Sequence, residues 1–415
     1  MTDDRLTREQ HIAEVHSKIG QKKLIIMMSI LMAVNAIAID ITLPAMEQMK
    51  DNFHADGLNE HQYIISSYLI GFGLSQLIFG PISDRFGRRI PLIAGLFFYA
   101  FSSLACAFAS SFWTLLLLRS VQGIGGAATR VMTVSIIRDL YHGRKMAEVL
   151  SIVMMIFMIV PIIAPATGQM ILFFGTWPLV FTLMSVVGFF LAFWVTLKLP
   201  ETVLERRFLT FVSIGAGFKQ ILRNRTACFY TLAFSVVLGA FFGALNTATQ
   251  IYNGIYHLGN WFPTAFATIA LFQAAASFFN AKFVGRFGMR KMSHTMLLCF
   301  IGISLVWFIW SLIDIVPFFI YMVLFTTIMF SFGSLGANFN ALAMEPLGKL
   351  AGTASSVFGF MQTTIGVSLG IIVGQTFNGT TIPIATSFVS LGLIALVFIL
   401  IAEKGKLLSA ENTLT

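Results

Sequence analysis

The chain has 415 residues, of which 57% are hydrophobic and only 11% are charged, against about 25% charged in an average soluble domain. Its formal net charge is +9, but the basic residues fall in short segments between long apolar runs, which argues against a nucleic-acid-binding surface. Cys106, Cys228 and Cys299 are isolated, without a CxxC or Cys/His companion, so a disulfide scaffold and a metal site are both excluded. The composition is typical of a polytopic membrane protein.

A transmembrane helix needs about 20 consecutive, mostly apolar residues. Twelve segments of the sequence meet this requirement, and their long runs do not alternate as the strands of a membrane β-barrel would. We therefore predict an all-α polytopic membrane protein with twelve transmembrane helices. The predicted spans are 24–46, 61–82, 90–109, 112–136, 146–171, 178–198, 226–251, 262–285, 292–313, 317–341, 351–376 and 382–402.

The basic residues predict the orientation, because loops rich in Lys and Arg stay on the cytoplasmic side. With the N-terminus inside, all 27 Lys and Arg residues fall in cytoplasmic segments except Lys50, Arg119 and Arg130. Both termini are therefore expected in the cytoplasm. The predicted parts are an N-terminal arm at 1–23, a six-helix bundle at 24–198, a polar linker at 199–225, a second six-helix bundle at 226–402 and a cytoplasmic tail at 403–415.

A weak internal repeat supports the division into two halves. GPISDRFGRR at 80–89 recurs as AKFVGRFGMR at 281–290, about half the chain later. Both copies lie between the second and third spans of their half. Two six-span halves related by an axis along the membrane normal are an arrangement found in secondary transporters.

The first copy of this repeat is the most informative segment of the sequence, because it places one acid among three arginines around a glycine. An ordinary positively charged loop is one interpretation of it. The segment also resembles the signature loop of the major facilitator superfamily, Gly-x-x-x-Asp-Arg-x-Gly-Arg-Arg, at its expected place between spans 2 and 3. The resemblance implies a gating role for Gly80, Asp84, Gly87, Arg88 and Arg89. It also implies a weaker gating interaction in the second copy, where Gly285 replaces the acid.

Span 4 contains two arginines, Arg119 and Arg130. A charged side chain at membrane depth is costly, so it indicates a function unless it reaches the interface by snorkelling. RSVQGIGGA at 119–127 resembles the span-4 motif of the same superfamily, whose arginine is associated with proton transfer. Arg119 is therefore a candidate for proton coupling. Arg130, nearer the cytoplasm, is either a snorkelling residue or a contact for an anionic substrate.

Asp40 is the only acid placed well inside a predicted span. Burial penalises an ionised carboxylate, so this residue is a candidate proton site. AIDITLPAM at 38–46 resembles the span-1 signature of the Bcr/CflA drug-resistance branch, in which an aspartate occupies this place. At a rise of 1.5 Å per residue, Asp40 and Arg119 lie about 9 and about 10 Å below the outer boundary. We expect the two residues to carry proton coupling together, and a purely structural pair is the alternative.

Span 5 contains the sequence IVPIIAPATGQM, in which Pro161, Pro165 and Gly168 are expected to kink the helix. The segment resembles the span-5 antiporter motif of the superfamily only loosely, because Val160 occupies the place of the usual glycine. A kink without a further role is the alternative.

Polar residues within apolar spans are candidates for lining a substrate cavity. The alternative for each is an interhelical hydrogen bond of about 0.6–2 kcal/mol. The candidates are Asn35, Tyr68, Gln122, Arg130, Asn246, Gln250, Gln273 and Asn338.

The resemblance covers nearly the whole chain and implies a proton-coupled transporter of the bacterial inner membrane. Such a protein exports small lipophilic compounds by alternating access, with protons and membrane lipid as its partners, and we expect a monomer. An exporter or importer of one metabolite, such as a siderophore or an amphipathic anion, is the alternative, and the two span-4 arginines favour it. The sequence has no GxxxxGK[ST], HExxH or GxSxG motif, so we expect neither ATP hydrolysis, nor an enzyme, nor a cofactor.

Overall fold

The structure is a computed structural model that describes residues 12–408, apart from residues 56, 142, 204–214, 216–218 and 220. The predicted linker at 199–225, the start of the N-terminal arm and the end of the tail lie largely outside the described residues. The described part of the chain is almost entirely helical and contains no β-strand. The predicted all-α class is therefore confirmed.

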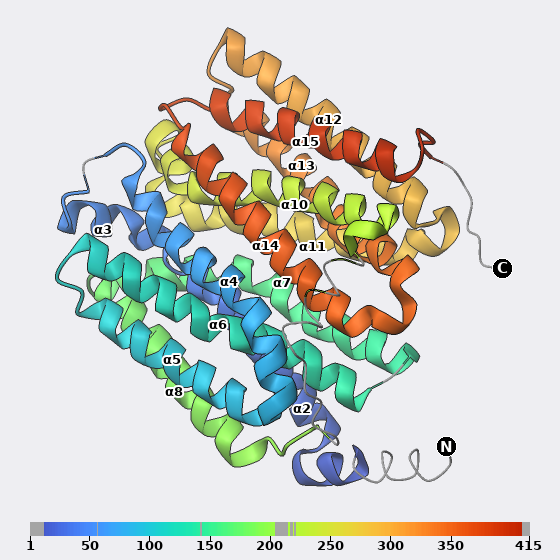
Figure 1. Ribbon diagram of the computed structural model, residues 1–415. Helices are drawn as coiled ribbons and strands as arrows, with labels where there is room; N and C mark the ends of the chain where they lie inside the picture. Colours follow the sequence, from blue (N-terminus) through green and yellow to red (C-terminus); the bar gives the residue numbers. More distant parts are fainter. Residues whose placement is uncertain are drawn as a thin grey trace. The chain divides into compact units, whose positions relative to one another are not determined.

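In the described part of the chain, twelve long helices occupy the twelve predicted spans (Figure 1). Eleven helical segments of the described chain are long and apolar enough to cross a membrane. The twelfth is α6, whose three arginines and many small residues lower its hydropathy. The helices are α2 (Gln21–Asp40), α4 (Tyr63–Phe86), α5 (Arg89–Ala107), α6 (Phe112–Leu140), α7 (Gly143–Phe174), α8 (Pro178–Lys198), α10 (Arg225–Asn246), α11 (Phe262–Phe287), α12 (Met289–Ile313), α13 (Phe318–Met344), α14 (Ala351–Gln375) and α15 (Ile382–Ala402).

Local sequence signals explain where several helices begin and end. The Ser111 hydroxyl accepts a hydrogen bond from Thr114 N–H at the start of α6, and the Asn224 side chain caps α10 in the same way. Gly87 separates α4 from α5 with a φ of 89°, and Gly288 separates α11 from α12 with a φ of 82°. These left-handed conformations favour glycine because it has no Cβ.

Two spans differ from the uninterrupted helices that the sequence predicted. Span 1 ends as an α-helix at Asp40 and continues through a 3-10 turn, Leu43–Ala45, into the short helix α3 (Met46–Asn52). Pro44 lies in this turn and has no N–H to donate to the preceding helical turn. Span 7 ends at Asn246 and is followed by a π-helical turn, Gln250–Ile255.

The contacts between residues divide the chain into two compact units. The first contains the described residues of Met1–His54 and Ser67–Val212, and the second contains those of Ala55–Ser66 and Ser213–Thr415. Helices α2 and α5 to α8 belong to the first unit and α10 to α15 to the second. Helix α4 belongs to the first unit except for its first turn, which groups with the second.

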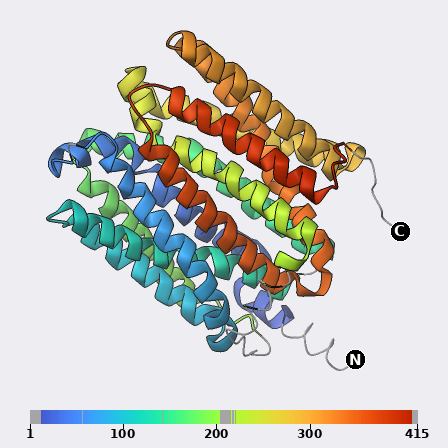
Figure 2. The ribbon, with the colours of Figure 1, turned by 45° about the horizontal axis from the view of Figure 1, so that its top comes forward.

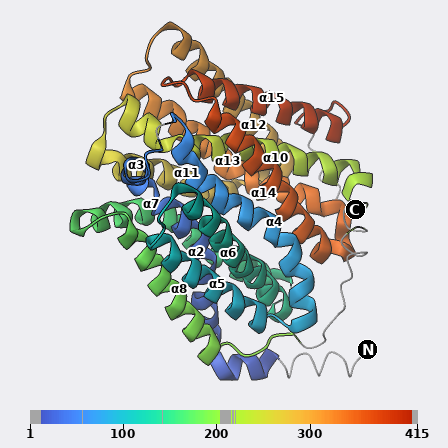
Figure 3. The same cartoon turned by 60° about the vertical axis from the view of Figure 1, so that its left-hand side comes forward.

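In the first unit, α5 lies beside α6 and α8, while α2 contacts α6 and α7 (Figure 3). The backbones of α4 and α6 approach closely at two glycines. A Cβ on Gly71 would lie 2.0 Å from Ser120 O, and one on Gly123 would lie 2.0 Å from Tyr68 O. Small residues therefore permit the close helix packing that is typical of membrane proteins.

In the second unit, α10 lies between α14 and α15 and also contacts α13 (Figure 2). Helix α12 packs against α13 and α15. Aromatic side chains fill the space between these helices: the Trp307 ring is fully buried and packs edge-on against Tyr321, Phe325 and Phe388. Edge-to-face packing is the geometry that aromatic pairs prefer.

Candidate functional site

Arg119 is the centre of a buried polar network in the first unit. Its side chain is fully buried, and its Nη1 donates a hydrogen bond of 2.6 Å to Gln122 Oε1, one turn later on α6. The guanidinium carbon lies 4.8 Å from the ring centroid of Tyr68 and 5.7 Å from that of Phe181. Cation–π contacts of this kind are worth about 0.5–2 kcal/mol and offset part of the cost of burying the charge.

The same network extends to α5 through Gln122. Gln122 Nε2 donates to Ser103 Oγ at 2.6 Å, and the Ser103 hydroxyl donates to Tyr99 O at 2.6 Å. The sequence indicated Gln122 as a candidate but missed Ser103, because a small hydroxyl in an apolar span is too common to serve as a signal.

Tyr68 joins the network to α2. Its hydroxyl donates to Asn35 Oδ1 at 2.9 Å, and Asn35 Nδ2 donates to Thr129 Oγ1 at 2.9 Å. A Cβ on Gly126 would lie 2.4 Å from Tyr68 OH and 2.6 Å from Asn35 Oδ1, so glycine leaves the space in which these groups meet. The structure thus brings four predicted residues together, namely Asn35, Tyr68, Arg119 and Gln122.

Asp40 lies at the C-terminal end of α2 and is 6% exposed. Among the described residues, no ion pair joins it to Arg119, so the direct contact suggested by their similar depth is not formed in this structure. A glycine of the neighbouring helix lies close to this end of α2: a Cβ on Gly168 would be 2.3 Å from Ile41 O. The buried carboxylate therefore lies beside a close contact between α2 and α7.

Arg130 is placed differently from Arg119. It is half-buried, and its guanidinium carbon lies 5.7 Å from the ring centroid of Phe72. No acid lies within ion-pair distance of it in the described part of the chain. Its predicted contact with substrate stays a prediction.

Helix α7 runs as one α-helix through Pro161 and Pro165. The predicted kink stays a prediction. Gly168, the third residue of that prediction, has the packing role against Ile41 described above.

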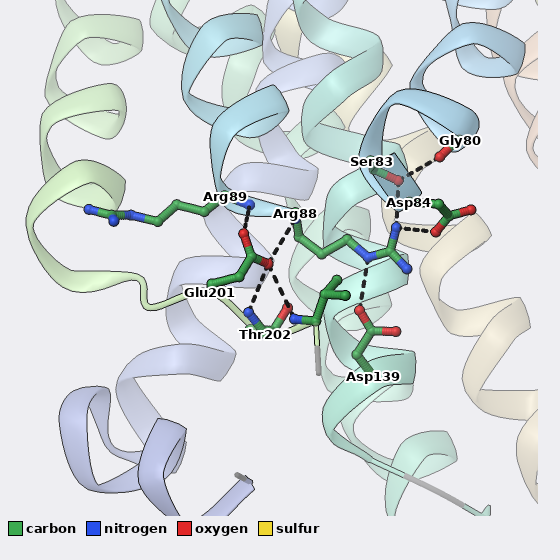
Figure 4. A network of polar contacts seen from close by, with 9 residues as sticks. Gly80, Ser83, Asp84, Arg88, Arg89, Asp139, Glu201 and Thr202 are labelled. Atoms are coloured by element: carbon green, nitrogen blue, oxygen red, sulfur yellow. Dashed lines mark hydrogen bonds and ion pairs between the residues drawn. The ribbon is translucent and has the colours of Figure 1, made fainter. Parts of the chain in front are cut away.

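The repeated motif forms a charge cluster at the end of α4, which we name the Arg88 cluster: Ser83, Asp84, Arg88 and Asp139 (Figure 4). Arg88 Nη1 donates to Asp84 Oδ1 and, at 2.6 Å, to Ser83 Oγ. Arg88 Nε donates to Asp139 Oδ2 at 2.8 Å, and the Ser83 hydroxyl donates to Gly80 O. Asp139 at the end of α6 was not predicted as a partner.

Burial lowers the pKa of Arg88, but the hydrogen bond and charge of Asp139, together with Asp84, outweigh burial and raise the pKa above its usual value. The guanidinium is therefore charged at every accessible pH.

Glu201 caps the start of α5 beside this cluster (Figure 4). Its carboxylate accepts hydrogen bonds from the N–H groups of Arg88 at 2.9 Å and Arg89 at 3.3 Å, and from Thr202 N–H at 2.9 Å. Because a helix N-terminus carries unpaired N–H groups and a positive partial charge, a carboxylate there is stabilising. The Arg89 side chain points away and donates to Thr196 O. The sequence did not indicate Glu201.

The second copy of the motif forms a cluster in the second unit, which we name the Arg290 cluster: Tyr230, Arg290, His294, Glu345 and Glu403. Arg290 Nη2 donates to Glu345 Oε2 at 2.9 Å, and Nε donates to Glu403 Oε1 at 3.0 Å. The second copy therefore has two acids, although Gly285 supplies none. They come from the residue after α13 and the residue after α15.

The polar candidates of the second unit are mostly engaged in hydrogen bonds between segments. Asn246 Nδ2 donates to Gly370 O at 3.3 Å, and Asn338 Nδ2 donates to Asn280 Oδ1 at 2.7 Å. Gln250 Nε2 donates to Leu58 O at 2.7 Å and to Asn59 Oδ1 at 2.8 Å. These contacts fit the alternative interpretation of the three residues, in which they form structural hydrogen bonds and do not line a substrate cavity. Gln273 is half-buried on α11.

Comparisons with known proteins identify the family and the fold. The family model described as "Major Facilitator Superfamily" matches residues 28–371. The chain is 27% identical to the bicyclomycin resistance protein homolog of Haemophilus influenzae and 27% identical to multidrug resistance protein D of Escherichia coli. Each alignment covers 86% of this chain and 90% of the relative. A crystal structure of a D-xylose-proton symporter matches with a TM-score of 0.70 at 12% identity, covering 93% of this chain and 99% of that one.

Proposed function

Because the chain belongs to the major facilitator superfamily, and its relatives support the Bcr/CflA-like branch, we propose that it exports small lipophilic compounds in exchange for protons. Membership makes it a multi-pass membrane transporter of a small-molecule substrate rather than an enzyme. The printed names of the relatives, a bicyclomycin resistance protein homolog and a multidrug resistance protein, support drugs or toxic compounds as the substrates.

The proposal includes an orientation. Loops rich in Lys and Arg are retained in the cytoplasm, so both termini lie there. The proposal also takes the protein to be a monomer of the bacterial inner membrane. In this orientation the Arg88 and Arg290 clusters face the cytoplasm, and the end of α2 with Asp40 faces the outer side.

The observation that carries the proposal is the buried Asp40 carboxylate at the end of α2. Burial without a cation at ion-pair distance favours the neutral acid, whereas access to water favours the anion. A change in helix packing that opens this site to one side would therefore release or take up a proton. Substrate and proton then compete for the site across the transport cycle, which is the requirement for exchange.

Asp40→Asn tests this role because it keeps the size of the side chain and removes the titratable group. We expect the variant to bind substrate without pH dependence and to lose efflux driven by a proton gradient in everted vesicles. Asp51→Asn is the matched control, since Asp51 is an exposed acid on α3 and should behave as wild type. Gradient-driven efflux by Asp40→Asn with an unchanged pH profile would show that the carboxylate is structural.

A protonophore provides the second arm of the test. It should abolish efflux at constant ATP, because the sequence has no Walker loop through which ATP could act. Efflux that continues under these conditions would indicate another coupling ion or a passive facilitator.

Export of one amphipathic anion is the second candidate function, and Arg130 favours it. This half-buried cation lies over Phe72 with no acid at ion-pair distance among the described residues, so it suits a carboxylate attached to an apolar body. A competition experiment decides between the two candidate functions. It compares the binding of a lipophilic cation and a lipophilic carboxylate to wild type and to Arg130→Gln. A selective loss of carboxylate binding in the variant supports the anion.

A further inference from the structure

His294 is a buried histidine that the transport proposal does not use. It lies on α12, is 1% exposed, and has a polar partner at each ring nitrogen. Its Nδ1 accepts a hydrogen bond of 3.2 Å from Leu408 N–H, in the chain that follows α15. Its Nε2 lies 3.0 Å from the Tyr230 hydroxyl of α10.

These partners determine where the proton of His294 resides. The Tyr230 hydroxyl has one hydrogen, and it donates that hydrogen to Glu403 Oε1 at 2.7 Å. The Tyr230 oxygen must therefore accept from His294 Nε2–H, while Nδ1 is the acceptor for Leu408 N–H. Every hydrogen bond is satisfied only by the neutral imidazole with its proton on Nε2.

The chain after α15 is held in a strained conformation. Lys404 and Leu408 have φ values of 54° and 60°, in the left-handed region that costs a residue other than glycine about 1–2 kcal/mol. Such a conformation persists only where surrounding contacts hold it. Beyond the turn that ends α15, the hydrogen bond to His294 is the contact that fixes Leu408.

We propose that His294 is a positioning residue for the segment Lys404–Leu408 and for Glu403, and that protonation of Nδ1 releases the segment. An imidazolium has an N–H at Nδ1, which faces the N–H of Leu408 instead of accepting from it. The N–H of Leu408 then loses its partner, and the strained backbone at Leu408 relaxes.

The charged groups around His294 set the balance of this switch. Glu403, at the end of α15, is linked to it through Tyr230 and favours the imidazolium. Arg290, one turn earlier on α12, opposes it and pairs with Glu403 and with Glu345 beyond α13. Glu403 Oε1 accepts hydrogen bonds from both Tyr230 and Arg290. An imidazolium at His294 would be a second cation beside Arg290 and would change the contacts of Glu403 within the Arg290 cluster. In the orientation of the proposed function, the switch responds to acid in the cytoplasm and is separate from Asp40.

Hydrogen exchange of the full-length protein in detergent tests the proposal without substrate or a gradient. After correction for the intrinsic exchange rate, the amides of 404–408 should be protected at pH 8. They should lose protection by up to roughly tenfold per pH unit below the ordinary histidine range near 6.5. His294→Gln should keep protection at both ends of the range, because its amide can accept from Leu408 N–H, donate to Tyr230 and not titrate. His257→Gln, an exposed histidine outside the cluster, is the control and should follow wild type.

A second variant covers the case in which His294→Gln does not fold. Leu408→Pro removes the donor N–H and, because proline fixes φ at about −65°, also the left-handed conformation at 408, so residues 404–407 should be unprotected at every pH. The same pH-dependent loss in His294→Gln, no loss in wild type, or wild-type behaviour of Leu408→Pro would each overturn the proposal. None of these results bears on Asp40, so failure here is distinguishable from failure of the proposed function.

Discussion

The Arg88 cluster and the Arg290 cluster come from the same repeated motif, yet they use it differently. A shift of 201 residues aligns Arg290 with Arg89, not with Arg88. In the first unit Arg88 binds the acids and Arg89 reaches a backbone carbonyl, whereas in the second unit Arg290 binds two acids itself. The two units therefore share an arrangement, an arginine at the start of a helix that meets acids near the ends of other helices, and not a residue-by-residue copy.

The two clusters also differ in exposure. The Arg88 side chain is 6% exposed and its partners are 15% and 20% exposed, while the Arg290 side chain is 19% exposed and its partners Glu345 and Glu403 are 44% and 14% exposed. Water and salt weaken an exposed ion pair, whereas removing one partner of a buried pair leaves an uncompensated charge. The comparison predicts that equivalent substitutions have larger effects in the first unit.

Arg88→Ala should have the largest effect on stability. It leaves Asp84 and Asp139 near each other without the cation that binds both, at a cost of about 3–5 kcal/mol in the free energy of unfolding. Arg290→Ala should cost about 1–2 kcal/mol, because Glu345 can be solvated and Glu403 keeps its hydrogen bond from the Tyr230 hydroxyl. Unfolding of the purified protein with SDS measures both. Equal losses in the two variants would remove the distinction between the clusters. The free energy of unfolding of Arg88→Lys should fall between those of wild type and Arg88→Ala, because Lys keeps the charge but loses the planar set of donors of Arg.

Gly87→Ala tests how the Arg88 cluster is joined to Glu201. Its φ of 89° costs an alanine about 1–2 kcal/mol, and the new Cβ would lie 2.2 Å from Glu201 Oε2. We expect a total loss of about 2–3 kcal/mol, because the carboxylate must leave its place at the start of α5. Gly379→Ala is the matched control: its φ is 86°, but its Cβ would meet no atom within 4 Å. A thermal melt that shows the same loss for both variants would contradict the role of Glu201 as a neighbour.

Apolar length was sufficient to locate the helices. The predicted spans 178–198 and 382–402 coincide with α8 and α15, because an apolar run of this length without alternation satisfies its backbone groups in lipid by forming a helix. The break after Asp40 at Pro44 and the π-helical turn at Gln250–Ile255 were missed, since apolar content does not register a local change of hydrogen bonding.

The candidate site also shows what could not be predicted from the sequence. A rise of 1.5 Å per residue gives the depth of Asp40 and Arg119 but not the side of the helix from which each projects. Arg119 instead contacts Gln122, Tyr68 and Phe181. Asp139, Glu345 and Glu403, which complete the two clusters, and Glu201, which lies beside the first, are far from the motif in sequence, so only the fold brings them to it.

Glu201→Ala should have an intermediate effect. It removes a carboxylate that accepts from the first N–H groups of α5, and loss of such a cap costs about 1–2 kcal/mol. Glu201→Gln keeps one acceptor oxygen and should lose about half as much, mainly the interaction of the charge with the helix dipole. Hydrogen exchange at the start of α5 measures the fraying directly. Identical exchange in the two variants would show that the charge, and not the acceptor, dominates.

Glu345→Gln should have the smallest effect, and its dependence on salt distinguishes the two clusters. Glu345 is 44% exposed, so its pair with Arg290 contributes about 0–1 kcal/mol and is screened by added salt. Glu403→Gln, at a carboxylate that is 14% exposed and accepts from both Arg290 and Tyr230, should cost more and depend less on salt. SDS unfolding at about 0.05 M and about 0.5 M salt measures both terms, because the Debye length falls about threefold over that range. If Glu345→Gln loses as much stability as Glu403→Gln and the loss persists at high salt, then exposure does not set the strength of these pairs. The contrast between the two units would then have to rest on the number of partners each arginine has.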